Sequence, residues 1–316
     1  MKTKTAFYTA LTLAVISFSG CKKDKQLTPT PAQTVGATSL KSFYAQNEVK
    51  LEQFTFNAST GGTFTSVQGS KITVPANCFV DRHNNPVTGN LTIGFKDIFK
   101  KSDMLFSNMP TNFFNGAPLK SGGEFFISIS GQDSISLGAG KKVDVAQPLL
   151  GQAVDNNMVP MVIPPDSAAI AKLNGWAVNP VDTLAITPSG YVFSLYQFNA
   201  PYSAGTWCNS DNSTYFSSLT QTSFSILNYE AYVIDVFLIF KDVNSMVHVY
   251  GTAPNHNDYA YAPEGKECTV VAMGYDNNGK LHTSFTPTTI TSNGSVTLTF
   301  SEMNEDDFKT AVKALD

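Results

Sequence analysis

Short runs of alternating apolar and polar residues recur between about residues 54 and 300, separated by clusters of turn-forming residues. A repeat of two is typical of a β-strand with one buried face, whereas a helix repeats every 3.6 residues. The repeat is clearest in the runs KITV, NLTIGFK, EFFISIS and SVTLTF. Turn clusters such as DRHNNPVTG and DNNG follow at short intervals, which favours antiparallel hairpins over strand–helix–strand units. The sequence therefore predicts an all-β protein.

One strand and two helices stand out within this pattern. Residues 232–240, YVIDVFLIF, are apolar at almost every position, which predicts a central strand covered on both faces. The run PDSAAIAKLNG predicts a short helix that ends at its Asn-Gly pair. In the C-terminal MNEDDFKTAVKALD, Asn304 is placed to cap a helix that we expect to pack against the second sheet. The apolar stripe of that helix consists of Phe308, Ala311, Val312 and Leu315.

These patterns predict two antiparallel β-sandwich-like domains with a short C-terminal α-helix. The Pro-rich stretch VPMVIPPD, residues 159–166, is the best internal boundary, because proline is rare inside central strands. We therefore expect one sandwich over residues 40–164, a short helical linker over 165–175 and a second sandwich over 176–316.

The N-terminus has the organisation of an export signal. Lys2 and Lys4 precede a mostly apolar segment, Phe7 to Phe18, of about a dozen residues. A bilayer-spanning helix needs roughly 20 apolar residues, so this segment has the length of a signal-peptide core instead. The segment ends in FSGC, with Cys21 followed at once by charged residues.

The FSGC sequence resembles the lipobox of bacterial lipoproteins, in which a leader is removed before a cysteine that then receives acyl chains. The resemblance implies a signal peptide over residues 1–20, a lipidated Cys21 that carries palmitate, and a flexible tether over residues 21–39. The Pro- and Thr-rich composition after Cys21 supports an extended tether. The alternative is an ordinary secretory signal in which the cysteine is a coincidence.

Charge and cysteine content argue against nucleic acid and metal. The chain of 316 residues has a formal net charge of −4, and no basic block follows the tether. After Cys21, Cys78, Cys208 and Cys268 remain, and an odd number cannot all pair. One disulfide with a spare thiol and three buried free thiols are both compatible with this count. The cysteine spacing matches no zinc pattern, so we expect no metal and no cofactor.

No motif indicates catalysis. The segment GYDNNGKL nearly spells a phosphate-binding loop, but Leu281 stands where Ser or Thr should follow Lys280, so a hairpin turn is the better interpretation. His256 beside Asp258 is the best candidate for a base or a metal ligand, yet no second histidine stands at i+2 or i+4 of it. The sequence therefore predicts a protein that is not an enzyme and serves as a binding or structural module.

Aromatic residues crowd the region between about residues 191 and 216. Most of them are expected in the core. Those expected in loops, together with the polar residues between them, predict a sugar-stacking platform and an alternative function in carbohydrate binding or glycan processing. The candidate ligand-binding residues are Tyr202, Trp207, Asn209, Asp211 and Tyr215.

Two stretches, KITVPANCFVDRHNNPVTGNLTIGF and SDMLFSNMPTNFFNGAPLKSGGEFFISIS, resemble a pattern in cell-envelope lipoproteins of the Bacteroidota. The first stretch is also faintly similar to ZU5-type sandwich domains. The resemblance implies a β protein of the cell envelope, anchored through Cys21 and located at the outer membrane, on a face that it leaves open. The partners that we expect are the lipid bilayer and either a glycan or another envelope protein.

Overall fold

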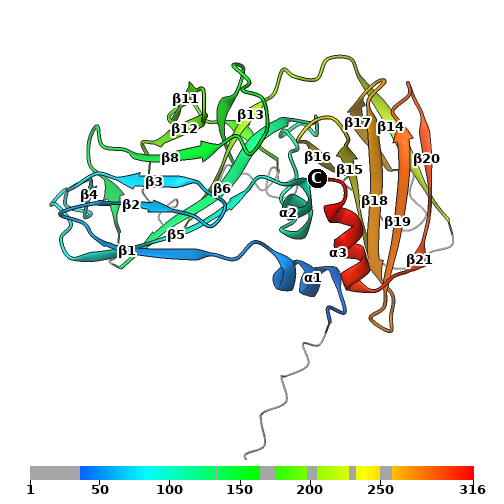
Figure 1. Ribbon diagram of the computed structural model, residues 1–316, viewed down its shortest axis with the longest axis horizontal. Helices are drawn as coiled ribbons and strands as arrows, with labels where there is room; N and C mark the ends of the chain where they lie inside the picture. The colour runs from blue at the N-terminus through cyan, green and yellow to red at the C-terminus, as the bar shows by residue number, and fades with distance from the viewer. Residues whose placement is uncertain (1–35, 132–133, 164–174, 198–204, 228–232, 250–257) are drawn as a thin grey trace, which may run out of the picture. The chain divides into compact units, whose positions relative to one another are not determined.

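The computed structural model describes residues 36–131, 134–163, 175–197, 205–227, 233–249 and 258–316. These residues belong to one compact unit that begins at Gly36, and about half of them lie in β-strands (Figure 1). The predicted all-β class is therefore confirmed. The expected leader, Cys21 and most of the tether lie outside the described residues, as does all of the helix expected over 165–175 except Gly175. Within the described ranges, no helix is long and apolar enough to cross a bilayer.

The first sandwich is formed by a six-stranded and a five-stranded sheet. The six-stranded sheet has the order β1 (Glu52–Asn57), β5 (Asn90–Ile98), β6 (Lys120–Ser130), β13 (Thr206–Asn212), β9 (Val159–Val162) and β10 (Ala177–Val178). The five-stranded sheet has the order β11 (Thr183–Thr187), β12 (Gly190–Leu195), β8 (Val143–Pro148), β3 (Lys71–Val74) and β2 (Gly62–Thr65). A short pair, β4 (Phe79–Val80) and β7 (Ser136–Leu137), lies beside them.

The core of the first sandwich explains the alternating pattern of its strands. Phe95 and Phe125 of the six-stranded sheet belong to one buried cluster with Val145 and Phe193 of the five-stranded sheet. The rings of Phe125 and Phe193 meet edge to face at 5.2 Å. Alternate residues of each strand therefore face the opposite sheet, as the repeat of two predicts.

The expected domain boundary differs from the observed one. The strands that follow the Pro-rich stretch pair with strands that precede it: β12 pairs with β8, and β13 pairs with both β6 and β9. Strands β10 to β13 therefore complete the first sandwich rather than beginning the second. The prolines did not prevent pairing, since Pro160 lies within β9 and its carbonyl accepts a hydrogen bond from Asn179 N.

The second sandwich has a three-stranded and a five-stranded sheet. The first has the order β17 (Asp258–Pro263), β14 (Leu219–Leu227) and β20 (Ser295–Thr299), in which β14 and β20 run parallel. The second has the order β16 (Met246–Val249), β15 (Ile234–Phe240), β18 (Glu267–Tyr275), β19 (Leu281–Thr289) and β21 (Ser301–Glu302). The expected DNNG hairpin is confirmed, because β18 and β19 pair directly across it.

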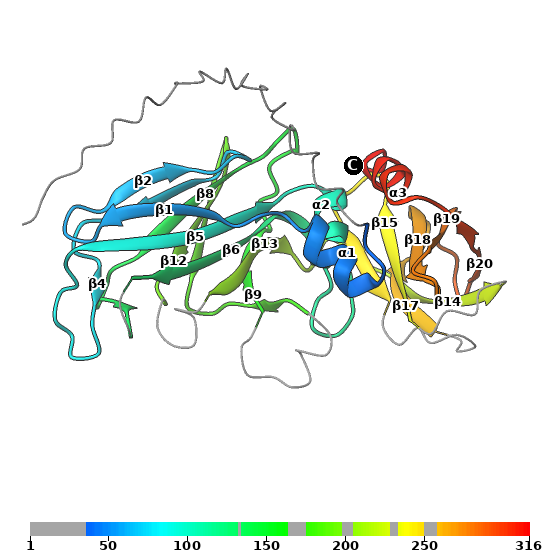
Figure 2. The same ribbon diagram turned by 90° about the horizontal axis from the view of Figure 1, so that it is seen from below.

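A third core joins the two sandwiches and explains why β15 is apolar on both faces. Val236, Leu238 and Phe240 face the core of the second sandwich, whereas Phe237 and Ile239 face the third core. The third core also contains residues of the six-stranded sheet and of three helices, α1 (Leu40–Asn47), α2 (Lys101–Phe106) and α3 (Glu305–Lys313) (Figure 2). The prediction of a central strand is therefore confirmed.

The C-terminal helix forms as its sequence predicts. The Asn304 side chain caps α3 by accepting a hydrogen bond from Asp307 N at 2.8 Å. Phe308 and Val312 are buried against the five-stranded sheet of the second sandwich. The ring centroids of Phe308 and Phe285 are 5.7 Å apart. The sequence patterns did not predict helix α1. It begins with a capping box between Ser39 and Ser42.

Candidate functional site

The predicted sugar-binding residues do not form a loop platform. Trp207, Asn209 and Asp211 lie in strand β13 rather than in a loop, and Asn209 and Asp211 are fully buried. Tyr215 follows the strand and is 39% exposed, whereas Tyr202 lies outside the described residues. Buried amide and carboxylate groups are closed to a sugar, so the structure does not bring this set together as a binding surface.

Trp207 instead packs against its own sheet. Its ring lies 5.5 Å from that of Phe126, its cross-strand partner, and Lys96 Nζ lies 5.3 Å from the Trp207 ring centroid. Lys96 also pairs with Glu48 at 2.7 Å, so the cation that covers the indole is held in place. The aromatic face that a sugar would need is thus in contact with the protein.

A groove beside the C-terminus is a concave site formed by described residues. Its floor is one face of the five-stranded sheet of the second sandwich, the face that is covered by α3. Cross-strand pairing places Ile239, Thr269 and Pro287 in one row across β15, β18 and β19. The neighbouring row, Phe237, Val271 and Phe285, belongs to the third core, so the groove begins where that core ends.

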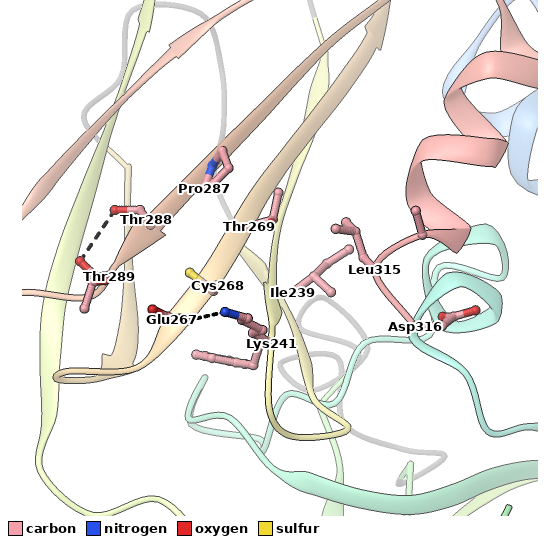
Figure 3. A pocket seen from close by; sticks show the side chains of 12 residues that line it. Ile239, Lys241, Glu267, Cys268, Thr269, Pro287, Thr288, Thr289, Leu315 and Asp316 are labelled. Carbon is pink, nitrogen blue, oxygen red and sulfur yellow. Dashed lines mark hydrogen bonds and ion pairs between the residues drawn. The ribbon is translucent and has the colours of Figure 1, made fainter. Parts of the chain in front are cut away.

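The walls of the groove are polar on one side and apolar on the other. Leu315 extends from the end of the chain toward Ile239, and Lys241 pairs with Glu267 at 2.7 Å at the opposite side (Figure 3). Thr288 and Thr289 add hydroxyl groups, and the groove has a volume of about 710 Å³. Small-ligand and peptide sites combine apolar side chains with a few polar groups, and the groove offers both, with a larger polar share than such sites usually have.

Two smaller hollows adjoin the groove through Asp316. Both are lined by Lys100 and Leu150 as well, so they extend from the C-terminus toward the first sandwich. Asp316 is fixed between them, because its side chain accepts hydrogen bonds from Ser102 N at 2.8 Å and from Ser102 Oγ at 2.7 Å. The chain end is therefore a defined part of the surface.

Three titratable groups of the groove, Lys241, Glu267 and Cys268, have pKa values shifted away from neutrality. The hydrogen bond between Lys241 and Glu267 raises the pKa of the amine and lowers the pKa of the carboxyl. Both groups therefore stay charged near neutral pH and are poor proton donors or acceptors. Burial raises the pKa of the Cys268 thiol to about 12, so this sulfur is not a thiolate at neutral pH. A general acid or base works best with a pKa near the working pH, and these three groups are shifted away from it.

The cysteines of the body are three buried free thiols, which decides between the two alternatives that their number allowed. Burial also raises the pKa of Cys78 to about 11, and it raises that of Cys208 well above its usual value. These thiols pack as small apolar side chains. No group of three or more histidine, cysteine or acidic residues that could hold a metal is found among the described residues, and His256 lies outside them.

A Tyr–Asp–His contact that the sequence did not indicate ties α1 to the second sandwich. The Tyr44 hydroxyl donates to Asp235 Oδ2, and His248 Nε2 lies 3.0 Å from Asp235 Oδ1. Burial raises the pKa of Asp235, but the hydrogen bonds with His248 and Tyr44 outweigh it and hold that pKa below its usual value. Asp235 is therefore an acceptor that fixes the helix at the start of the body.

We expect Tyr44→Phe to lower the free energy of unfolding by about 1–2 kcal/mol, because it leaves a buried carboxylate oxygen without its donor. Urea unfolding followed by circular dichroism measures the change. Tyr196→Phe removes an exposed hydroxyl and should change the same quantity by less than about 0.5 kcal/mol. Equal effects for the two variants would show that the Tyr44 contact does not stabilise the docked helix.

No protein-family model matches this chain, and no curated protein matches it. The resemblance to Bacteroidota lipoproteins therefore stays a prediction from the sequence, and the groove geometry is the structural basis for function.

Proposed function

We propose that the protein is a cell-envelope lipoprotein, anchored through an acylated Cys21 and located at the outer membrane, whose all-β body is a non-enzymatic binding or structural module. The observation that carries this proposal is the FSGC sequence at the end of a short apolar segment. One acyl chain binds a membrane only marginally, whereas two or three anchor a protein stably.

The first described residues support a tether joined firmly to the body. Ala37 N donates to Glu305 Oε2 at 3.1 Å, and Asn47 Nδ2 donates to Glu305 Oε1 at 2.9 Å. These bonds attach both ends of the α1 segment to the start of α3. Because the α1 segment is held here by hydrogen bonds, a pull on the anchored N-terminal segment acts on the folded body and not on a single strand of a sheet.

The groove supports the binding part of the proposal. Its floor combines Ile239 and Pro287 with the hydroxyl of Thr269, and the ion pair of Lys241 with Glu267 at its rim remains charged at neutral pH. This composition suits contact with a small ligand or an extended peptide, which would use the apolar floor for area and the rim for orientation.

We expect Cys21→Ala to abolish both labelling by radioactive palmitate and recovery in the membrane fraction when the full chain is expressed in a bacterium of the type that makes such lipoproteins. Removal of the thiol removes the site of acylation, and the remaining chain should be exported without an anchor. Gel fluorography and membrane fractionation measure the two effects.

Cys268→Ala is the matched control, because it removes a buried cysteine of the body and should keep both the label and the membrane attachment. Attachment that survives in Cys21→Ala, or a wild-type chain without label, would overturn the proposed anchor.

A further inference from the structure

Two fully buried carboxyl groups, Glu124 and Asp211, lie where the first sandwich meets the third core. The pairing of β5, β6, β13 and β9 places Ile98, Glu124, Asn209 and Met161 in one row across the six-stranded sheet (Figure 2). Ile98 and Met161 belong to the third core, and cross-strand partners share a face of the sheet. Glu124 therefore points into the apolar layer between the two sandwiches.

Hydrogen bonds between the two sandwiches are formed directly beside this pair of carboxyl groups. Ser121 is the cross-strand partner of Asp211. Ser121 N donates to Asn244 O at 2.8 Å, and Asn244 Nδ2 donates to Ser121 O at 3.0 Å. Asn244 belongs to the β15–β16 turn of the second sandwich. A charge on Glu124 or Asp211 would therefore act on the contact that joins the sandwiches.

Hydrogen-bond donors to the pair are few. Asn209 Nδ2 donates to Asp211 Oδ2 at 2.7 Å. Both carboxyl oxygens of Glu124, and Asp211 Oδ1, are buried without a hydrogen-bond partner in the described part of the chain. A buried carboxylate anion needs several donors or a cation, because its desolvation costs far more than that of the neutral acid. The geometry therefore favours the neutral acids.

Four basic side chains on the surrounding elements are engaged with other groups. A paired cation offers little compensation to a second carboxylate, so these side chains do not neutralise Glu124 and Asp211. They are Lys96 of β5, which pairs with Glu48; Lys120 of β6, which pairs with Asp155; Lys101 of α2, which donates to the Phe240 carbonyl; and His248 of β16, which pairs with Asp235.

The acidic and phenolic groups of these elements bring no positive charge to the pair. They are Asp97 of β5, Tyr191 of β12, Tyr44 of α1 and Asp242 of the β15–β16 turn. Burial raises the pKa of Glu124, and the neighbouring Asp211 raises it further. Burial also raises the pKa of Asp211, an effect that the Ser121 hydroxyl opposes only in part.

We propose that Glu124 and Asp211 are neutral carboxylic acids in the folded protein at neutral pH, so that the junction between the sandwiches depends on two bound protons and weakens as the pH rises. In the unfolded chain both groups release their protons above about pH 4. The pair's contribution to stability is therefore complete below that value. It is lost as the pH rises toward the raised folded-state pKa values, because the folded chain then binds more protons than the unfolded chain.

The first test is urea unfolding of the detergent-solubilised full chain at pH 5 and at pH 8. The comparison is with Glu124→Gln/Asp211→Asn, which replaces each acid by a neutral group of the same shape. We expect the folding equilibrium constant of the double variant, relative to wild type, to increase by about tenfold per pH unit for each proton that is held. Any constant packing effect of the amides cancels in this ratio. Glu124→Gln alone should show a smaller increase in the same direction.

Asp155→Asn is the matched control, because it makes the same chemical change at a buried carboxyl that pairs with Lys120 at 2.8 Å. Hydrogen bonds hold the pKa of Asp155 below its usual value, so this carboxyl is ionised in both the folded and the unfolded chain from pH 5 to pH 8. The ratio of its folding equilibrium constant to that of wild type should therefore stay the same over this range.

Infrared spectroscopy tests the bound protons directly. At pH 7 the wild-type chain and Asp155→Asn should both show the carbonyl band of a protonated carboxylic acid, and the Glu124→Gln/Asp211→Asn chain should lack it. A ratio of folding constants that is equal at pH 5 and pH 8 in both Glu124 variants, or a wild-type spectrum without this band, would overturn the proposal and assign the pair the ionised form.

Discussion

Replacing Phe308 with alanine is expected to lower the free energy of unfolding by about 3–5 kcal/mol, the range for truncating a buried phenylalanine. Phe308 is fully buried, and its ring lies 5.7 Å from the rings of both Phe43 and Phe285. From α3 it therefore contacts both α1 and the five-stranded sheet of the second sandwich. The measurement is the midpoint of guanidinium unfolding, with the slope of the transition unchanged.

Phe114→Ala is the control for this experiment, because Phe114 is 44% exposed and its removal should cost less than about 1 kcal/mol. Phe308→Leu should fall between the two, since it retains most of the buried volume. If Phe308→Ala were no more destabilising than Phe114→Ala, α3 would not be part of the cooperative core.

Features that depend on neighbouring residues were predictable from the sequence. The cap at Asn304, the buried stripe of α3 and the DNNG hairpin each involve side chains within a few positions of one another. The apolar strand β15 was predictable as well, because a strand covered on both faces needs apolar residues at its odd and its even positions. Such patterns indicate burial without indicating what covers each face.

Pairings between distant strands were not predictable. The sequence places VPMVIPPD between two patterned halves, but it does not indicate that Val159–Val162 pairs with β13 about 50 residues later. The polar run in β13 was misinterpreted for the same reason. Asn209 and Asp211 have the composition of a loop, and only the pairing with β6 shows that they are buried against Glu124 and Ser121.

The groove depends on register in the same way. Ile239, Thr269 and Pro287 come from three strands and meet because of the pairing of β15, β18 and β19. Nothing in the local sequence around each residue distinguishes it from other strand residues. The candidate site therefore follows from tertiary structure, whereas the predicted anchor follows from a local motif.

Replacing Lys120 with methionine is expected to lower the free energy of unfolding by about 3 kcal/mol at pH 7, the lower end of the range for removing one partner of a buried ion pair. Lys120 Nζ lies 2.8 Å from Asp155 Oδ2, whose side chain is 8% exposed. Methionine keeps most of the apolar stem, so the loss comes mainly from an unpaired buried carboxylate. Lys120 Nζ also lies 4.7 Å from the Tyr215 ring centroid, which adds a smaller cation–π contribution.

The pH dependence separates charge from packing. Burial raises the pKa of Asp155, but the hydrogen bond from Lys120 and those from Asn157 and Asn212 hold it below its usual value. A lowered folded-state pKa stabilises the protein above the unfolded value of about 3.9, and that stabilisation is lost as the pH falls through the folded-state pKa. The destabilisation caused by Lys120→Met should therefore shrink between pH 7 and pH 4, because the unpaired Asp155 carboxyl then takes up a proton.

A second substitution at Asp155 decides the matter at constant pH. In Lys120→Met/Asp155→Asn the buried charge is removed while an oxygen remains to accept the hydrogen bond from Asn157 N, at 2.9 Å in the wild type. The double variant should recover at least half of the loss, which a double-mutant cycle measures by denaturant unfolding. A loss that is equal at pH 4 and pH 7, and unchanged by Asp155→Asn, would mean that the lysine stem stabilises this part of the first sandwich by packing and that the ion pair contributes little.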